Sequence, residues 1–388
     1  MRTTKITHDT PMSCPEDTVW RVIGTMSGTS CDGLDVVLVE IRAKGEAVTL
    51  LESTGFDYGP EWSERMRQLN ILPERKALKL EQEWTRWVAD RIAGCLRIWV
   101  PAHGPLHLVG FSGHTWYHEP GGRGTKAIGD GDLLSRMLGL PVVADYRSAD
   151  LAAGGQGAPL VPLFDVVVFS RYGACLNLGG IANITWLSGA ADGLVRAADL
   201  CGANLLLNRQ ARRAGLAFDR DGALARSGSV QEPALHLLDD WPYLRRPAPK
   251  SLAAEDLDLL HQILDGIAEP RDAAATAVEW VARTVAGSLE PSEDDGRALL
   301  VTGGGAHHLH LMERLRVHLP SGWTLEVPEP QWVDGKEAVA FAWLALRTAL
   351  GMTTSLASVT GAEKDVCGGR LFGNFAGTDN GSEACSTT

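Results

Sequence analysis

The sequence predicts an α/β protein of two domains. Its 388 residues are more than one ordinary hydrophobic core organises. Hydrophobic residues make up 45% and charged residues 22%, which suits a globular chain with a large interior. Stretches with strand periodicity alternate with stretches of helical periodicity along the chain, which favours a mixed architecture over an all-α or all-β one.

The net charge limits the possible partners. The chain carries 36 Lys and Arg against 48 Asp and Glu, a formal net charge of −12 at pH 7. Proteins that bind nucleic acids or anionic membranes need basic patches that displace counterions. The basic cluster at Arg209, Arg212 and Arg213 is typical of a solvated helix face. We therefore expect neither a nucleic acid nor a membrane as a partner.

The cysteines and the first residues indicate the compartment. The seven cysteines are an odd number without C-x-x-C spacing, so neither a disulfide framework nor a zinc site is expected. The first eighteen residues lack the apolar core of a signal peptide, and no run of about 18 apolar residues could span a membrane. These features predict a cytoplasmic protein.

Two hairpins with the same plan suggest a duplicated fold. The first has strands at 19–25 and 35–41 around a wide, glycine-containing turn, 27–33. The second repeats this plan much later in the chain, around a turn at 179–183. A protein of two similar lobes would contain such a pair.

The remaining predicted elements connect and follow these hairpins. Helices are predicted at 78–99, 309–318 and 336–350, and further strands at 106–111, 141–144, 174–178, 184–187 and 298–301. The segment 145–162 is expected to be an ordered crossover between domains. The predicted division is into disordered tails at 1–18 and 373–388, domain 1 at 19–147 plus 353–372, and domain 2 at 148–352.

Three glycine turns could bind a nucleotide. Glycines expose backbone N–H groups, and several such groups pointing inward bind an anion. The turns at 27–33 and 179–183 could therefore cradle phosphates, and the turn at 303–306, which precedes a helix, could lie against a nucleoside. Each signal is weak when taken singly, and the alternative is a plain turn. No P-loop pattern occurs, and no G-x-G-x-x-G follows a strand.

Carboxylates beside the first turn indicate magnesium. Asp32 and Asp35 lie where a phosphate-binding turn would end, and their charge would repel phosphate unless Mg²⁺ lay between them. Magnesium prefers carboxylates, waters and phosphate oxygens together. The alternative is that Asp32 only forms an Asx turn before Gly33.

Several segments match one known family, in the family's order. They are Gly24–Asp35, His118–Pro120, Ile128–Gly131, Pro141–Arg147, Asp150–Pro162, Asn177–Asn183, Phe218–Gly222, Gly303–Ala306, Glu337–Ala345 and Val359–Ala362. On these segments the chain resembles the anhydro-N-acetylmuramic acid kinases, most strongly at Asp150–Pro162. The resemblance implies an actin–hexokinase (ribonuclease H-like) fold of two lobes with a central cleft, and a homodimer.

The resemblance also implies a reaction. ATP would transfer its γ-phosphate to the 6-oxygen of 1,6-anhydro-N-acetylmuramic acid while water opens the anhydro bridge, giving N-acetylmuramic acid 6-phosphate in cell-wall recycling. Water attack at the anomeric carbon needs a carboxylate base on the face opposite the leaving oxygen. The family's base corresponds to Asp199 here. The alternative is that Asp199 caps the following helix.

The other site residues follow from the same resemblance. Residues expected at ATP are Ser27, Gly28, Thr29, Ser30, Cys31, Asp32, Gly33, Leu34, Asp35, Asn177, Gly179, Gly180, Asn183, Gly303, Gly304, Gly305 and Ala306. Residues expected at the sugar are Thr115, His118, Glu119, Asp150 and Asn204. Asp32 and Glu337 would hold Mg²⁺, although Glu337 could instead be a favourable charge in the first turn of the last helix. His114, four residues before His118, is expected to face the sugar rather than zinc.

The sequence departs from the family pattern around the sugar and the base. Leu200–Ala203 replaces a threonine- or cysteine-glycine-proline-glycine turn, Asn208 stands where an aspartate is usual, Ala127 replaces a glutamine and His308 an asparagine. The phosphate turns are intact. Two alternatives therefore stay open: a kinase for a related anhydro-sugar or another sugar, and a non-catalytic ATP-binding paralogue.

Overall fold

The computed structural model describes residues 18–28, 30–42, 47–119, 122, 124–187, 195–292 and 296–375. The chain forms two compact units. One, called here the inserted unit, is Asp165–Lys336. The other, called the flanking unit, consists of the described residues before 165 and after 336.

The units divide inside helices. The divisions fall within α5 (Val161–Val168) and within α12 (Pro330–Ala349), so residues 148–164 and 337–352 belong to the flanking unit. The domain boundaries expected at 147/148 and 352/353 stay predictions of how the chain divides. The expected tails lie outside the described residues, except for their inner ends. There, Phe375 is buried and packs on Trp20, with ring centroids 5.1 Å apart.

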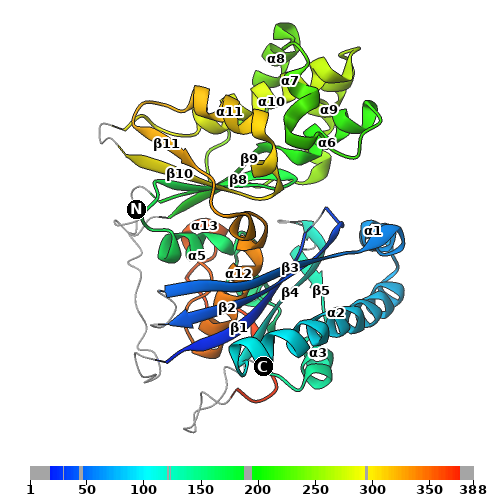
Figure 1. Ribbon diagram of the computed structural model, residues 1–388, viewed down its shortest axis with the longest axis vertical. Helices are drawn as coiled ribbons and strands as arrows, with labels where there is room; N and C mark the ends of the chain where they lie inside the picture. Colours follow the sequence, from blue (N-terminus) through cyan, green and yellow to red (C-terminus); the bar gives the residue numbers. More distant parts are fainter. Residues whose placement is uncertain are drawn as a thin grey trace. The chain divides into compact units, whose positions relative to one another are not determined.

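In the flanking unit, the described strands form one seven-stranded sheet (Figure 1). Its strands are β1 (Trp20–Ser27), β2 (Gly33–Arg42), β3 (Ala47–Asp57), β4 (Leu108–Glu119), β5 (Gly124–Ile128), β6 (Val142–Ala144) and β12 (Arg370–Phe372). The order is β12-β6-β4-β1-β2-β3, with β5 paired to β4. β1, β2 and β3 form an antiparallel meander, and β4 and then β6 add in parallel beside β1.

The inserted unit repeats this topology. Its described strands are β7 (Ala174–Leu178), β8 (Ile181–Trp186), β9 (Arg196–Gly202), β10 (Arg297–Thr302) and β11 (Trp323–Glu326). Their order is β11-β10-β7-β8-β9, in which β7 to β9 are an antiparallel meander and β10 and β11 add in parallel beside β7. Both sheets therefore have the ribonuclease H-like arrangement, and the α/β prediction is confirmed.

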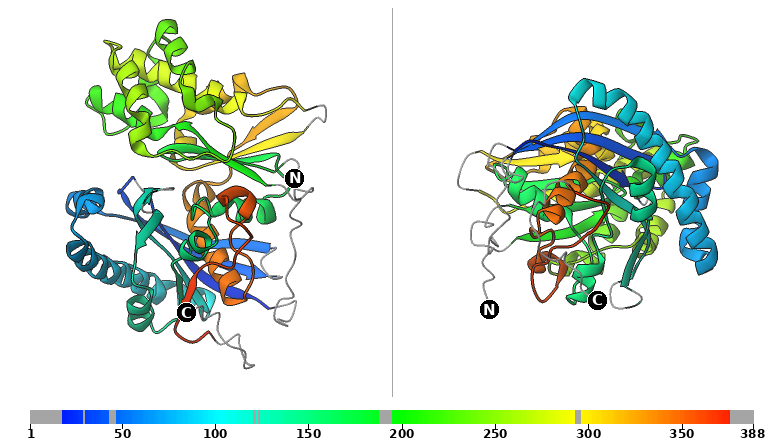
Figure 2. Two further views of the ribbon diagram at one scale, coloured as in Figure 1. Left: turned by 180° about the vertical axis from the view of Figure 1, so that it is seen from behind. Right: turned by 90° about the horizontal axis from the view of Figure 1, so that it is seen from below.

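Helices cover both faces of the flanking sheet, as the right view of Figure 2, seen from below, shows. On one face, α2 (Glu74–His103) stacks Trp84 on Phe111 of β4, with ring centroids 5.4 Å apart. On the other face, α12 approaches so closely that a Cβ at Gly24 would lie 1.9 Å from the carbonyl oxygen of Ala338. Glycine is required there because no side chain would fit between strand and helix.

The other helices complete each unit. The flanking unit contains α1 (Gly59–Arg67), α3 (Gly131–Leu138), α4 (Ser148–Ala152), α13 (Ala357–Thr360) and a 3₁₀ turn at Leu69–Ile71. The inserted unit contains α6 (Asn204–Arg213), α7 (Ala223–Arg226), α8 (Glu232–Asp239), α9 (Asp258–Asp265), α10 (Pro270–Gly287), α11 (Leu309–His318) and 3₁₀ turns at Arg220–Gly222, Pro242–Arg245, Ala254–Leu257 and Gly304–His307. In α10 every residue from Ala273 to Ala282 is buried, which makes it the central core helix of this unit.

Two predicted turns are narrower than expected. Ser27 ends β1 and Gly33 begins β2, so both are strand residues. The second turn consists of Gly179 and Gly180, because β8 already begins at Ile181. Among the described residues, no helix has both the length and the hydropathy that crossing a bilayer requires.

Candidate active site

Three predicted site residues lie side by side on adjacent strands of the sheet in the inserted unit. Asn177 on β7 pairs with Asn183 on β8, and Asn183 pairs with Asp199 on β9. Directly paired residues share one face of a sheet. The register then skips Leu200, and both Leu200 and Cys201 are buried, so the regular ladder is interrupted immediately after Asp199. Such bulges recur beside active sites, where they bend the strand and re-aim a side chain.

The surroundings of Asp199 suit a general base. Its half-buried carboxylate accepts a hydrogen bond of 2.9 Å from the backbone N–H of Leu252. Burial raises the pKa of Asp199 to about 6, although the bond from Leu252 opposes this rise. The backbone of Asp199 is also fixed, because the Asp199 N–H donates to the Lys250 carbonyl and the Asp199 carbonyl accepts from the Tyr243 hydroxyl. A carboxyl with this pKa can take up a proton near neutral pH.

The second glycine turn and the start of α6 are bonded to each other. The carbonyl oxygens of Gly179 and Gly180 accept the N–H groups of Asn204 and Leu205, at 3.1 Å each. The side-chain amide of Asn204 donates to the carbonyl of Leu178, also at 3.1 Å. With its carbonyls turned to α6, the turn can offer its N–H groups to an anion.

The third glycine turn lies against the second. A Cβ at Gly303 would lie 2.4 Å from Oδ1 of Asn177, and one at Gly305 would lie 2.7 Å from Cβ of Leu178, so both positions require glycine. A Cβ at Gly304 would lie 3.7 Å from the side-chain amide nitrogen of Asn204, so Gly304 lies beside that amide. The inserted unit thus brings together Asn177, Gly179, Gly180, Asn183, Asp199, Asn204 and Gly303–Ala306.

A hollow and a capping histidine lie at the start of α11, the helix that follows this turn. The hollow has a volume of about 480 Å³ at the start of α11 and is lined by Asp221, Ala223, Arg226, Ser227 and Leu309. His308 caps α11, since its Nδ1 accepts the N–H of Leu311 at 3.1 Å. Its Nε2 lies 3.2 Å from the Asp219 carboxylate. His308, a departure from the family pattern, therefore has a structural role.

In the flanking unit, the first turn is tightly bonded. The N–H of Cys31 donates to the carbonyl of Gly28 at 3.1 Å, and the Ser30 hydroxyl donates to Asp32 at 2.7 Å. Cys31 has a φ of 54°, a conformation that disfavours a residue with a Cβ. The Asp32 side chain is exposed and Asp35 is half-buried in β2. Thr29, also expected at ATP, lies outside the described residues.

Three side chains near this turn are buried. Leu34 has no exposed surface and belongs to the core beneath α2. The Ser27 hydroxyl is buried and contacts Tyr58 and His114. His114 is 2% exposed, so the expectation that it faces a sugar is wrong. Its direction depends on a strand register that the sequence pattern does not reveal.

A second bulge aligns two predicted sugar residues. Thr115 of β4 pairs with Ala127, and His118 pairs with Thr125, while the register skips Trp116. Ala127 and Thr125 are two residues apart on β5 and share a face, so Thr115 and His118 share one too. Nδ1 of His118 lies 2.5 Å from the Thr125 hydroxyl, which donates to the Gln156 carbonyl at 3.1 Å. Burial lowers the pKa of His118.

The remaining predicted residues of this unit lie in different environments. Glu119 is exposed, whereas Asp150 has no exposed surface. The Asp150 carboxylate accepts hydrogen bonds from the hydroxyls of Ser355 and Thr360, at 2.9 and 2.7 Å, and from the N–H of Gly157 at 2.8 Å. These bonds tie the crossover loop after α4 to α13.

Glu337 does not open its helix. Because α12 begins at Pro330, Glu337 lies well inside it, and the first-turn interpretation is wrong. Glu337 is half-buried and interacts electrostatically with Arg147, whose pKa is lowered by burial and raised in part by Glu337 and Asp150. Among the described residues, no three His, Cys, Asp or Glu side chains cluster as a ready-made metal site.

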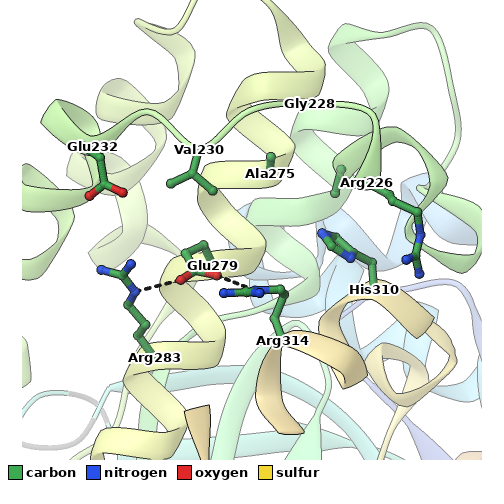
Figure 3. A pocket seen from close by; sticks show the side chains of 10 residues that line it. Arg226, Gly228, Val230, Glu232, Ala275, Glu279, Arg283, His310 and Arg314 are labelled. Atoms are coloured by element: carbon green, nitrogen blue, oxygen red, sulfur yellow. Dashed lines mark hydrogen bonds and ion pairs between the residues drawn. The ribbon is translucent and has the colours of Figure 1, made fainter. Parts of the chain in front are cut away.

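Another pocket in the inserted unit contains none of the predicted site residues (Figure 3). It has a volume of about 380 Å³ between α10, α11 and the loop around Gly228. On its floor, Glu279 accepts bonds of 2.8 and 2.7 Å from Arg283 and Arg314, and lies 2.8 Å from Nε2 of His318. Burial would raise the pKa of Glu279, but these partners outweigh it and lower the pKa to about 2. This network joins α10 to α11.

Two ribonuclease H-like units with glycine turns at their first hairpins define a protein of the actin–hexokinase class. The family model described as anhydro-N-acetylmuramic acid kinase matches residues 20–374. The chain belongs to this family.

Relatives agree with this assignment. The chain is 36% identical over 371 residues to an anhydro-N-acetylmuramic acid kinase of Ruegeria sp. (strain TM1040), covering 90% of this chain and 94% of the relative. It is 38% identical over 380 residues to one of Cereibacter sphaeroides, covering 91% and 96%. Among solved structures, component A of (R)-2-hydroxyglutaryl-CoA dehydratase from Acidaminococcus fermentans matches with a TM-score of 0.42 and 13% identity, over 85% of this chain and 99% of that one.

Proposed function

We propose that this enzyme uses ATP to phosphorylate the 6-oxygen of 1,6-anhydro-N-acetylmuramic acid while water opens the anhydro bridge, giving N-acetylmuramic acid 6-phosphate for cell-wall recycling. Membership of the family supports the substrate. The observation that carries the mechanism is Asp199, a half-buried carboxyl with a pKa of about 6 on the same sheet face as Asn177 and Asn183.

Asp199 would act as the general base. It accepts a proton from water as the water oxygen bonds to the anomeric carbon and the bond from that carbon to the 6-oxygen breaks. The 6-oxygen then needs no proton, because it takes the γ-phosphoryl group and ADP leaves. The proton on Asp199 passes to solvent after the products form. The bond from the Leu252 N–H fixes the carboxylate orientation during these steps.

The glycine turns would hold the nucleotide. N–H groups of the first turn, other than that of Cys31, which donates to the Gly28 carbonyl, would bind the phosphates together with those of Gly179 and Gly180. The hollow at the start of α11, the helix that follows Gly303–Ala306, has a volume suited to a nucleoside. The exposed Asp32 carboxylate fits Mg²⁺, which takes one or two carboxylates together with phosphate oxygens and waters. When bound, Mg²⁺ would neutralise phosphate charge. Glu337 is the second carboxylate that we propose near Mg²⁺.

The sugar would contact Thr115, His118, Glu119 and Asn204. Thr115 and His118 lie on the same face of the sheet, which supports a joint role at the sugar. The hydrogen bond between Nδ1 of His118 and Thr125 leaves Nε2 of His118 available to a sugar hydroxyl. Asp150, with its carboxylate occupied by three donors, fits a positioning role for the loop better than a direct contact. A homodimer and a cytoplasmic location belong to the same proposal.

A coupled assay tests this function. Purified protein is mixed with Mg-ATP and 1,6-anhydro-N-acetylmuramic acid, ADP release is followed, and the product is analysed for a phosphate on the 6-oxygen. We expect ADP release that depends on the sugar and equals the phosphorylated product. Turnover of other sugars with none of this one would refute the substrate. ATP binding without turnover of any sugar would refute the catalytic role.

A further inference from the structure

Ser27 and His114 face each other because β4 contains a bulge. Regular pairing of β1 with β4 would set Ser27 opposite Gly113, but Ser27 pairs with His114 instead. Gly113 has a φ of 71°, which glycine adopts readily and which such bulges use. The bulge also puts Phe111 and His114 on one face, where both rings lie against Trp84, with centroids 5.4 and 6.2 Å away.

The polar atoms at this place form a chain whose hydrogen positions can be derived. The indole N–H of Trp84 only donates, so the Tyr58 hydroxyl accepts it, at 3.0 Å. The Tyr58 hydroxyl then donates to Oγ of Ser27 at 2.6 Å, and the Ser27 hydroxyl donates to Nδ1 of His114 at 2.8 Å. This order gives every one of these buried hydrogens an acceptor. It leaves His114 neutral, with its hydrogen on Nε2.

The same chain reaches both ends of the first glycine turn. Nε2 of His114 lies 3.9 Å from Sγ of Cys31, which is buried and has the unfavourable φ of 54°. The backbone N–H of Tyr58 donates to the Asp32 carbonyl at 3.0 Å. Burial lowers the pKa of His114 to about 4, so the ring is neutral at physiological pH. Ser27, Cys31 and Asp32 are thus held by residues whose own side chains are buried.

We propose that His114 is a positioning residue for ATP: it holds Ser27 and Cys31, and with them the backbone N–H groups of Gly28 and Ser30 that would face a phosphate. This inference rests on the proposed function, which assigns the turn to ATP. His114 acts only through the turn, and Ser27 contributes its backbone rather than its hydroxyl. Loss of the ring nitrogens would loosen the phosphate site and leave the sugar side unchanged.

The test is His114→Phe, which keeps a buried ring and removes both nitrogens. We expect the KM for ATP to rise on the order of tenfold, equivalent to about 1.4 kcal/mol of binding, and the KM for the sugar to change by less than about twofold. His114→Asn should restore most of the ATP affinity, because its amide oxygen can accept the Ser27 hydroxyl. Tyr58→Phe, which removes only the hydroxyl at the other side of Ser27, should raise the KM for ATP as well.

The matched control is His107→Phe. Nδ1 of His107 accepts the N–H of Arg21 at 2.9 Å, at the opposite end of the same two strands. This variant should melt earlier than wild type with both KM values unchanged. If folded His114→Phe and Tyr58→Phe keep the wild-type KM for ATP, or if nitrogen NMR finds the His114 hydrogen on Nδ1, the inference is overturned. A wild type that neither binds nor consumes Mg-ATP would instead refute the proposed function, and this inference with it.

Discussion

Asn183 and Asp199 lie directly opposite each other on β8 and β9, at the last regular pair before the ladder skips Leu200. An amide carries no net charge, so this neighbour does not offset the burial of the Asp199 carboxylate, in keeping with its raised pKa. The same geometry leaves the carboxylate half-buried beside a polar sheet face. The relationship leads to the first three predictions below.

Asp199→Asn should lower kcat by at least about 10², because an amide cannot accept the proton of the attacking water. ATP binding, measured by calorimetry, should be unchanged. Asp240→Asn, an exposed position of the same unit, is the control and should keep full activity. An Asp199→Asn enzyme within about tenfold of wild type would exclude Asp199 as the base.

The kcat/KM for the sugar should fall as the pH drops below about 6. The base must be ionised to accept a proton, and burial raises the pKa of Asp199 to about 6. Well below this pH the rate should fall about tenfold per unit, as expected for one essential ionisation in the free enzyme. The measurement is a pH–rate profile between pH 5 and 8, with the stability of the enzyme checked at each pH. A flat profile over this range would contradict the assignment.

Asp199→Asn should be more stable than wild type at alkaline pH. A carboxyl whose pKa is raised by folding stabilises the fold only while it is protonated, and this contribution is lost as the pH rises through the folded pKa. The shift from 3.8 to about 6 corresponds to at most ~3 kcal/mol. Melting temperatures should therefore differ most at pH 8 and converge below pH 4. A variant that melts below wild type at pH 8 would argue against an unfavourable buried charge.

Glu279→Gln should destabilise the inserted unit. The pKa of Glu279 is lowered from 4.5 to about 2, so its stabilisation is present above pH 4.5 and is lost as the pH falls toward 2. The expected loss at pH 7 is about 3 kcal/mol in the free energy of unfolding, measured with urea. Glu313→Gln removes the exposed partner of Arg226 and should cost far less, because solvent screens an exposed ion pair. Equal losses for the two variants would contradict the role given to burial.

Asp150→Ala should lower stability by about 3 kcal/mol, because the hydroxyls of Ser355 and Thr360 and the N–H of Gly157 would lose their buried acceptor. Thermal melting of the variant measures this loss. If stability is unchanged while the KM for the sugar rises more than about tenfold, Asp150 contacts the sugar after all.

Two elements next to glycine turns were predicted to the residue. β7 ends at Leu178 before Gly179, and α11 covers 309–318 after the turn that begins at Gly303, both as predicted. β4 was predicted only as far as 111 but continues to Glu119, because the bulges at Gly113 and Trp116 break the alternation that marks a strand. Glu337 was misplaced in its helix since the first turns of α12 carry no clear apolar period.

The linear order of residues was sufficient to determine the α/β class, the two matching hairpins, the family and the candidate base, because these depend on residue type and spacing along the chain. Which way each side chain points was decided only by the tertiary structure. A bulge of one residue moves the following side chain to the other face of a sheet, and so it turns His114 into the interior while Thr115 and His118 come to share the opposite face.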